Sequence, residues 1–259
     1  MLERKSHGPV TLVQDACGPV TIAFTERTGG VSQPPFASLN LGTHVGDDAQ
    51  AVAENRRRVL AALDAEDVAC RLLVPNQVHG DHVAVVTSSE PAQLDAVRDE
   101  IARGADAIVC TATDVPVMLC YADCVPVVLA SPEGFAVIHS GWKGTYARIS
   151  AKAARILMQT TGADASSIRA YIGPHIRGDE YEVSSDLMQR FAERFPGIDA
   201  AGSLLDLASC IRQALAKVGV PEEAIDDAGL STIRMNDRFF SYRAEHGTCG
   251  RHAAVAIMR

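Results

Sequence analysis

The sequence predicts an α+β fold, built from layers of sheet and helix in a single domain that spans residues 1–259. The length of 259 residues fits one large domain better than two average ones. Short apolar runs rich in β-branched residues gather in the middle of the chain, and tight turn signals separate them. Helical patterns follow these runs instead of alternating with them, which favours α+β layers over a strict βαβ succession.

The strands are predicted from short apolar runs that turn residues bound on both sides. We expect them at Val10–Val13, Val20–Thr25, Leu72–Val74, His82–Val86, Ala105–Cys110, Val115–Tyr121, Val125–Ala130, Phe135–His139, Ile168–Ile172 and His252–Met258. The four runs between Ala105 and His139 are expected to form one β-meander that is buried on most sides. The polar stretch Thr25–Gln50 keeps several apolar residues, so we interpret it as an ordered functional loop.

The helices are predicted from apolar residues that recur on one face at a spacing of three or four. We expect them at Asp48–Leu63, Tyr146–Thr160, Ser184–Arg194 and Leu204–Val218. Asp47 or Asp48 can cap the first of them, because a carboxylate at that position accepts a bond from a free backbone N–H.

Composition restricts the classes of partner. Hydrophobic residues make up 47% and charged residues 22%, which is ordinary for a globular protein and argues against disorder. A net charge of −8 gives no general attraction to nucleic acid or to anionic lipid, although a local basic pocket for a small anion stays open. No apolar run is long enough to span a membrane and no signal peptide is visible, so we expect a cytoplasmic location.

The seven cysteines are odd in number and widely spaced, and no C-x-x-C is present. This pattern does not indicate a disulfide framework and fits a reducing compartment. Two features single out Cys124. It follows a polar residue at the end of an apolar run, and it lies near His139 in a predicted hairpin. A turn at Pro132–Gly134 would pair Ser131 with Phe135 and place His139 opposite Val127, with Cys124 just past the strand end.

His79 is the third candidate, in a short polar segment between two predicted strands. Two imidazoles and a thiolate would make a three-ligand zinc site with an open fourth position. Other readings stay open at this point. A lone cysteine in an apolar run is more often core packing, and a lone histidine near a turn is more often a surface residue. The separations match no compact zinc motif, and the alternative ligands are His44, His82 and His175.

Several motifs occur together and in order from about Thr21 to Arg259. They are Phe24–Ser32, Ser38–Asp48, Asn76–Gly80, Ala105–Ala107, Ala122–Pro126, His139–Gly144, Ile172–Pro174 and Phe239–Arg243. As a set the sequence resembles the YfiH-like or polyphenol oxidase (laccase-domain) purine nucleoside phosphorylase family, also called the peptidoglycan editing factor family.

The resemblance implies a layered αββα sandwich with mixed β-sheets and a zinc site whose ligands, which are also the catalytic residues, are His79, Cys124 and His139. It implies phosphorolysis of adenosine, inosine and methylthioadenosine, with adenosine deaminase activity, so that purine nucleosides and phosphate are the expected small-molecule partners. Many relatives carry extra cysteines where this chain has Gly178–Val183 and Ser231–Thr232. Their absence makes copper, and a multicopper polyphenol oxidase, the less favoured reading.

Two further residues are candidates for substrate binding. Phosphorolysis needs a cation to hold phosphate, and Arg56 can supply a bidentate guanidinium, although it can equally be a solvated helix residue. Asn40 can bond the substrate or only its own turn. A metal-free cysteine hydrolase that uses Cys124 and His139, and a peptidoglycan-precursor editing factor, remain alternative functions.

Overall fold

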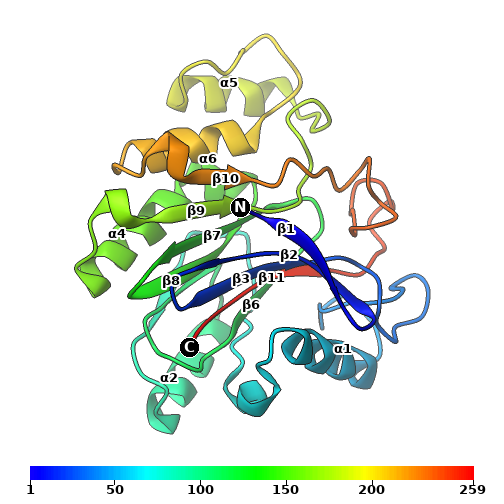
Figure 1. Cartoon of the computed structure of the whole chain (residues 1–259). Helices are drawn as coiled ribbons and strands as arrows, with labels where there is room; N and C mark the ends of the chain where they lie inside the picture. The colour runs from blue at the N-terminus through cyan, green and yellow to red at the C-terminus, as the bar shows by residue number, and fades with distance from the viewer.

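The computed structural model describes residues 1–259 and contains two β-sheets packed face to face (Figure 1). The five-stranded sheet has the order β1-β2-β3-β11-β6, and every pairing in it is antiparallel. Its strands are β1 (Glu3–His7), β2 (Val10–Cys17), β3 (Val20–Thr25), β6 (Val117–Tyr121) and β11 (His252–Met258).

The second sheet has six strands in the order β10-β9-β7-β8-β5-β4. They are β4 (Val83–Val86), β5 (Ala107–Cys110), β7 (Val125–Ser131), β8 (Gly134–Ser140), β9 (Arg169–Ile172) and β10 (Ile225–Asp227). The central pairings are antiparallel, whereas β4 with β5 and β10 with β9 run parallel, so the sheet is mixed.

Helices cover the outer faces of the two sheets, and together with the sheets they make the expected αββα layers. The helices are α1 (Ala49–Ala62), α2 (Pro91–Ala102), α3 (Trp142–Tyr146), α4 (Ile149–Thr161), α5 (Ser185–Arg194) and α6 (Leu207–Ala216), with 3₁₀ turns at Glu66–Arg71, Ala165–Ser167 and Glu222–Ala224. Helix α1 packs on the five-stranded sheet, while α4 and α6 pack on the six-stranded one. The predicted α+β fold class is therefore confirmed.

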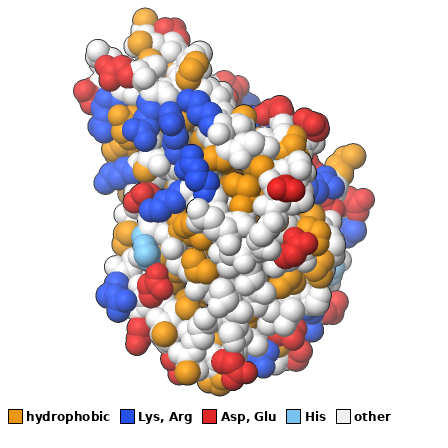
Figure 2. All heavy atoms as spheres, turned by 90° about the vertical axis from the view of Figure 1, so that its left-hand side faces the viewer, with side chains coloured by type: hydrophobic (Ala, Val, Ile, Leu, Met, Phe, Trp, Pro, Cys, Tyr) orange, Lys and Arg blue, Asp and Glu red, His pale blue; other side chains and the backbone are white.

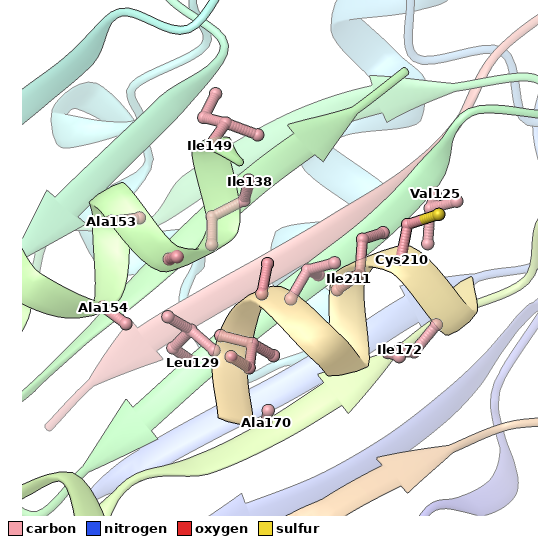
Figure 3. Packing of buried hydrophobic residues seen from close by; sticks show 14 of the residues in the cluster. Val125, Leu129, Ile138, Ile149, Ala153, Ala154, Ala170, Ile172, Cys210 and Ile211 are labelled. Carbon is pink, nitrogen blue, oxygen red and sulfur yellow. The ribbon is translucent and has the colours of Figure 1, made fainter. Parts of the chain in front are cut away.

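Three apolar layers hold these elements together. One lies between α1 and the five-stranded sheet and includes Val59 and Leu12. The layer between the sheets includes Phe24 and Phe135, and α2 adds Leu94 to it. The layer under α4 and α6 is shown in Figure 3, where Ile138 and Leu129 of the sheet face Ile211 and neighbouring alanines of the helices. Each fully buried side chain of the size of leucine contributes about 1.5–3 kcal/mol, so these layers supply most of the driving force for folding.

Polar caps explain where the helices begin. The Asp48 carboxylate accepts a bond from the Gln50 N–H, so Asp48 and not Asp47 is the cap of α1. Asp206 accepts from the Ser209 N–H, and α6 therefore begins at Leu207, later than the predicted Leu204. These caps satisfy backbone donors that the first helical turn leaves free.

The helix predicted at Tyr146–Thr160 begins three residues too early, since Tyr146 is the last residue of α3 and the rest corresponds to α4. Helix α3 ends at Tyr146, and Arg148 has a left-handed backbone with φ of 60° before α4 begins at Ile149. The predicted strand Leu72–Val74 is reduced to a single bridge between Leu73 and Val117. Helix α2 and strands β1 and β10 were not predicted from the periodicity of apolar residues.

The predicted β-meander is wrong. Strand β6 pairs with β11 in the five-stranded sheet, and β5 pairs with β8, so the four runs divide between the two sheets. The chain crosses from one sheet to the other at Ala122–Cys124. Asp123 makes this crossing with a left-handed backbone, φ of 87°, which asparagine and aspartate tolerate better than most residues. No helix has both the length and the apolarity that a membrane crossing requires.

Candidate metal centre and active-site pocket

Cys124 lies in the segment that crosses between the two sheets, directly before β7. The carboxylate of Asp123 fixes this segment, since it accepts one bond from the Thr232 hydroxyl at 2.7 Å and another from the Arg243 N–H at 2.7 Å. The Asp123 carbonyl accepts a third bond from the Ile176 N–H at 3.0 Å. The position of the thiol is thus set by contacts from three distant parts of the chain.

His139 lies near the end of β8, beside the start of β7. The predicted register is wrong by one residue, because Ser131 pairs with Gly134 across a two-residue turn and His139 pairs with Pro126 instead of Val127. The inference drawn from it still holds, since Cys124 and His139 lie at the same end of the hairpin. His139 is 3% exposed, and its Nδ1 lies 2.7 Å from the carboxylate of Asp106.

Asp106 connects His139 with the loop that carries His79. Its fully buried carboxylate accepts backbone N–H bonds from Val78 at 3.2 Å, His79 at 3.0 Å and Gly80 at 2.7 Å. A buried carboxylate with this many donors stays charged and orients all of them. Asp106 lies in the motif Ala105–Ala107, and the sequence alone does not indicate this role.

A second contact holds the His79 loop against the five-stranded sheet. The side-chain amide of Gln77 donates to the Cys120 carbonyl at 2.8 Å and accepts from the Cys120 N–H at 2.8 Å, as a neighbouring strand would. His79 itself has a left-handed backbone, with φ of 58°. Such a backbone is uncommon outside glycine and occurs often at functional sites.

The structure brings His79, Cys124 and His139 together. One ligand atom from each lies within 4.8 Å of the other two, and the two imidazole rings are 4.7 Å apart in an edge-to-face arrangement. Gly141 makes room for them. A Cβ at this position would lie 3.0 Å from the Cys124 Sγ and 3.2 Å from the His79 Cδ2. The burial of the three side chains decreases from His139 through Cys124 to His79, which is exposed.

The charges in this cluster favour a thiolate next to an imidazolium. Burial raises the pKa of Cys124, but the charge of His139 and hydrogen bonds from both histidines outweigh this effect and lower the pKa to about 6. Burial lowers the pKa of His139, while the Cys124 charge and the Asp106 hydrogen bond raise it to about 9. The thiolate is the form of cysteine that binds metals and attacks electrophiles.

The three side chains fit a zinc ion. Thiolate sulfur and imidazole nitrogen are ligands that Zn²⁺ prefers, and three protein ligands with one open position are the usual arrangement of catalytic zinc. Tetrahedral zinc needs ligand atoms about 3–4 Å apart, and the three ligand atoms lie within 4.8 Å of one another without any metal. The Asp106 bond to Nδ1 leaves the His139 Nε2 for a metal, as buried carboxylates do at many metal sites.

The three side chains open into a pocket with a volume of about 510 Å³, which is large enough for a nucleoside-sized molecule. Its walls combine flat aromatic groups with cations. The other residues that line it are His44, Gln77, Cys120, Tyr121, Ala122, Asp123, Trp142, Ile176, Tyr181, Leu207, Tyr242, Arg243 and Arg251.

Asn40 and Arg56 do not line this pocket. Asn40 is fully buried, and its amide bonds to Gly42, Asp47 and the Arg251 N–H. The Nε and Nη2 of Arg56 both donate to the Leu41 carbonyl, at 3.0 and 2.8 Å. In this structure both side chains therefore hold the loop that precedes α1.

A slightly larger hollow of about 570 Å³ lies away from the three side chains, between the β1–β2 turn and α1. Two arginines line it, but Arg57 pairs with Glu54 and Glu66, and Arg58 pairs with Glu54 and with the Gly29 carbonyl. Its charges are already satisfied, so the pocket beside His139 is the better candidate for a reaction site.

The chain is similar to several known proteins over nearly its whole length. A protein named purine nucleoside phosphorylase from Corynebacterium glutamicum is 36% identical over 92% of this chain and 94% of its own. A protein of the same name from Deinococcus radiodurans is 38% identical over 90% of this chain and 87% of its own. The crystal structure of the hypothetical protein YfiH from Bacillus licheniformis superimposes with a TM-score of 0.86 and 28% identity, over 99% of each chain.

The crystal structure of YlmD from Geobacillus stearothermophilus gives the same TM-score of 0.86, over 100% of this chain and 98% of that one, with 27% identity. The match to a family extends over residues 21–259 and so includes every residue of the pocket. The chain belongs to the family described as multi-copper polyphenol oxidoreductase laccase, whose members include the YfiH and YlmD proteins.

Proposed function

We propose that the protein is a zinc-dependent purine nucleoside phosphorylase that acts on adenosine, inosine and methylthioadenosine and that also deaminates adenosine. The observation that carries the proposal is the cluster of His79, Cys124 and His139 at one wall of a pocket of nucleoside size. The names of the relatives from Corynebacterium glutamicum and Deinococcus radiodurans support the same reaction class.

In this proposal His79, Cys124 and His139 hold the metal, which when bound supplies a Lewis acid for the reaction. Asp106 keeps the proton of His139 on Nδ1, so that Nε2 faces the pocket. The aromatic rings of Trp142 and Tyr242 offer flat apolar surfaces for a purine base. These groups bind and orient the nucleoside, which lowers the entropic part of the barrier.

Phosphorolysis consumes nucleoside and phosphate and yields the free base and a sugar 1-phosphate, which is ribose 1-phosphate from adenosine or inosine and 5-methylthioribose 1-phosphate from methylthioadenosine. A phosphate oxygen forms a bond to C1′ while the bond from C1′ to the base nitrogen breaks, and the base takes up a proton. Deamination consumes water and releases ammonia from C6. Both reactions place negative charge on groups inside the pocket, where fixed cations and N–H donors stabilise the transition state.

The decisive experiment incubates protein of measured zinc content with each nucleoside, with and without phosphate. We expect free base and the corresponding sugar 1-phosphate in equal amounts, dependent on phosphate, and ammonia from adenosine alone. Cys124→Ser should lose zinc and both activities together. If no nucleoside yields free base in the presence of phosphate, the proposed reaction is wrong.

A metal-free cysteine hydrolase is a second candidate, because Cys124, His139 and Asp106 are arranged as a nucleophile, a base and an orienting carboxylate. A chelator separates the two candidates, since only the zinc enzyme should lose turnover when the metal is removed. The family description makes a copper polyphenol oxidase another candidate, and oxidation of a phenol by copper-loaded protein tests it. A role as a peptidoglycan-precursor editing factor stays an alternative from the sequence.

A further inference from the structure

The pocket has a second chemical feature besides the three clustered side chains. Three basic residues, His44, Arg243 and Arg251, line it, and they come from two segments far apart in the chain. His44 lies in the loop before α1, whereas both arginines lie in the segment that leads into β11. Neither arginine has a carboxylate partner among the ion pairs of the structure, whereas half of the arginines of this acidic chain do.

Arg251 is held in place with part of its guanidinium unused. Its Nη1 donates to the carbonyls of Cys249 and Gly250, both at 2.9 Å, and its backbone N–H donates to the Asn40 side chain at 2.8 Å. Its Nε and Nη2 make no hydrogen bond within the protein. These two atoms form one edge of the planar fork, which is the edge that can bind two oxygens of an anion side by side.

Gly42 lies against the side chain of Arg251. A Cβ on Gly42 would lie 2.8 Å from the Arg251 Cγ and 3.4 Å from the His44 Cε1, so both side chains pack directly over this glycine. The contact places the arginine stem and the imidazole together without an intervening side chain. Such packing fixes the direction of the guanidinium before any ligand binds, which reduces the entropy lost on binding.

Arg243 is less constrained but is also free of carboxylates. Its guanidinium donates only to the Glu182 carbonyl, at 3.3 Å, and lies 5.5 Å from the centre of the Tyr181 ring. Its backbone N–H is the donor that anchors Asp123. The same residue therefore fixes the segment of Cys124 through its main chain and presents its charge to the pocket through its side chain.

No free carboxylate in the pocket competes for these cations. Asp123 is the only acidic residue in the lining, and its two oxygens already accept from Thr232 and Arg243. Burial, then the charges of Arg251 and His79, lower the pKa of His44, so the two arginines are the cations and His44 is a neutral hydrogen-bonding group beside them. A pocket with fixed cations and no free carboxylate selects a small anion even in a chain of net charge −8.

We propose that Arg251, together with Arg243 and His44, binds the inorganic phosphate that attacks the nucleoside. The assignment rests on the proposed phosphorolysis, and it differs from the sequence expectation, which gave this role to Arg56. Arg56 uses its Nε and Nη2 on the Leu41 carbonyl and does not line the pocket. Arg251 has this same edge free, in the pocket that contains His79, Cys124 and His139.

The test measures phosphate in two independent ways, by the phosphate dependence of base release and by equilibrium dialysis of radiolabelled phosphate against zinc-loaded protein without nucleoside. Arg251→Gln and Arg243→Gln should each raise the phosphate KM and the phosphate Kd at least 10-fold. The nucleoside KM should change less than 3-fold, and the zinc content should not change. Arg155→Gln, an exposed arginine of α4, is the matched control and should leave all four quantities unchanged.

The outcomes separate this inference from the proposed function. If wild-type protein binds phosphate and Arg251→Gln loses it, but no nucleoside reacts, the anion site stands and the phosphorylase proposal fails. If base release depends on phosphate but its KM is unaffected in both variants, the assignment is wrong. A selective rise in phosphate KM in Arg56→Gln alone would restore Arg56 to the role. Since the Arg243 side chain makes only one hydrogen bond to the protein and Arg243→Gln keeps its backbone bond to Asp123, this variant tests the site even if Arg251→Gln folds poorly.

Discussion

At the scale of single residues, Asp106 connects the parts of the candidate metal centre. It is fully buried, and its carboxylate bonds both to the His139 ring and to three consecutive N–H groups of the His79 loop. It therefore holds two of the three clustered side chains from one point. The sequence could name the motif around it but could not show this, since the bonds join segments that only the fold brings together.

Replacement of Asp106 by asparagine should weaken zinc binding by about 10–100-fold, the usual cost of losing a carboxylate behind a histidine ligand. The amide keeps the size of the side chain but turns an N–H group toward donors that need an acceptor. A chromophoric chelator in competition with the protein measures the affinity. Asp81→Asn is the control, because Asp81 is exposed and pairs only with Lys152. Unchanged affinity in Asp106→Asn would remove Asp106 from the metal centre.

His252 makes a prediction about stability and pH. It is fully buried beside Tyr121 and Phe239, and neither ring nitrogen has a hydrogen-bond partner. Burial, with a smaller contribution from the charges of Arg251 and Arg27, lowers its pKa to about 3. The unfolded chain takes up the proton near pH 6.5 and the folded one does not, so stability is lost as the pH falls below 6.5.

Each pH unit below that value should cost about 1.4 kcal/mol from this histidine alone. His252→Phe should remove the cost, so that its free energy of unfolding relative to wild type improves between pH 7 and pH 5. Urea unfolding at the two pH values measures this difference. His252→Leu repeats the test in case the phenyl ring fits poorly. Equal pH dependence in wild type and both variants would mean that the folded protein accommodates the charged ring.

At the scale of elements, the sequence located most helices and strands but not their partners. The apolar runs at Val117–Tyr121 and Val125–Ser131 are confirmed as strands, yet they belong to different sheets. The period of a strand shows which faces are buried, and both of these are buried on both faces, so the period carried no information about the sheet. The hairpin register was wrong by one residue because the turn has two residues and not three.

The element that follows β8 offers a sharp test of the cluster. Gly141→Ala should reduce zinc affinity at least 10-fold, because the new Cβ would lie 3.0 Å from the Cys124 Sγ and push it or the His79 ring aside. Gly202→Ala, at a surface position between α5 and α6, is the control. Zinc titration and thermal unfolding of both variants distinguish displaced ligands from a damaged fold. An alanine variant that binds zinc as tightly as wild type would show that the cluster is looser than described.

At the scale of the whole molecule, charge is distributed unevenly. Figure 2 shows Lys and Arg side chains gathered on one face of a chain whose net charge is −8. Four basic side chains lie in α3, in α5 and in the segment that follows α3, namely Lys143, Arg148, Arg190 and Arg194. None takes part in an ion pair, and the three arginines lie over the rings of Trp142, Tyr146 and Phe195.

This basic face should bind polyanions in spite of the net charge, because a local cluster acts within a Debye length of about 10 Å. We expect retention on immobilised heparin at low salt, with elution as the ionic strength rises. The double variant Arg190→Glu and Arg194→Glu should pass through unretained. Arg98→Gln, which lies on α2 and pairs with Asp95, is the control. Retention of the double variant at the same salt would locate the attraction elsewhere.

The layered fold class could be anticipated from the sequence, and the resemblance named the three side chains that the structure brings together. The cationic part of the pocket could not be found in the same way. Arg243 and Arg251 look like ordinary polar residues before a strand, and Arg56 lies in a more suggestive pattern. What distinguishes them is which hydrogen-bond donors remain free after folding, and this depends on contacts between the loop of Asn40 and the segment before β11.

The position of β11 bears on how the protein is made. It lies between β3 and β6, so the ribosome synthesises this inner strand of the five-stranded sheet after the strands on both sides of it. Until residues 252–258 emerge, β3 and β6 each have an unpaired edge, and such edges invite pairing with other chains. We therefore expect the nascent chain to need protection by chaperones until β11 has been synthesised, and stalled chains that lack these residues to aggregate.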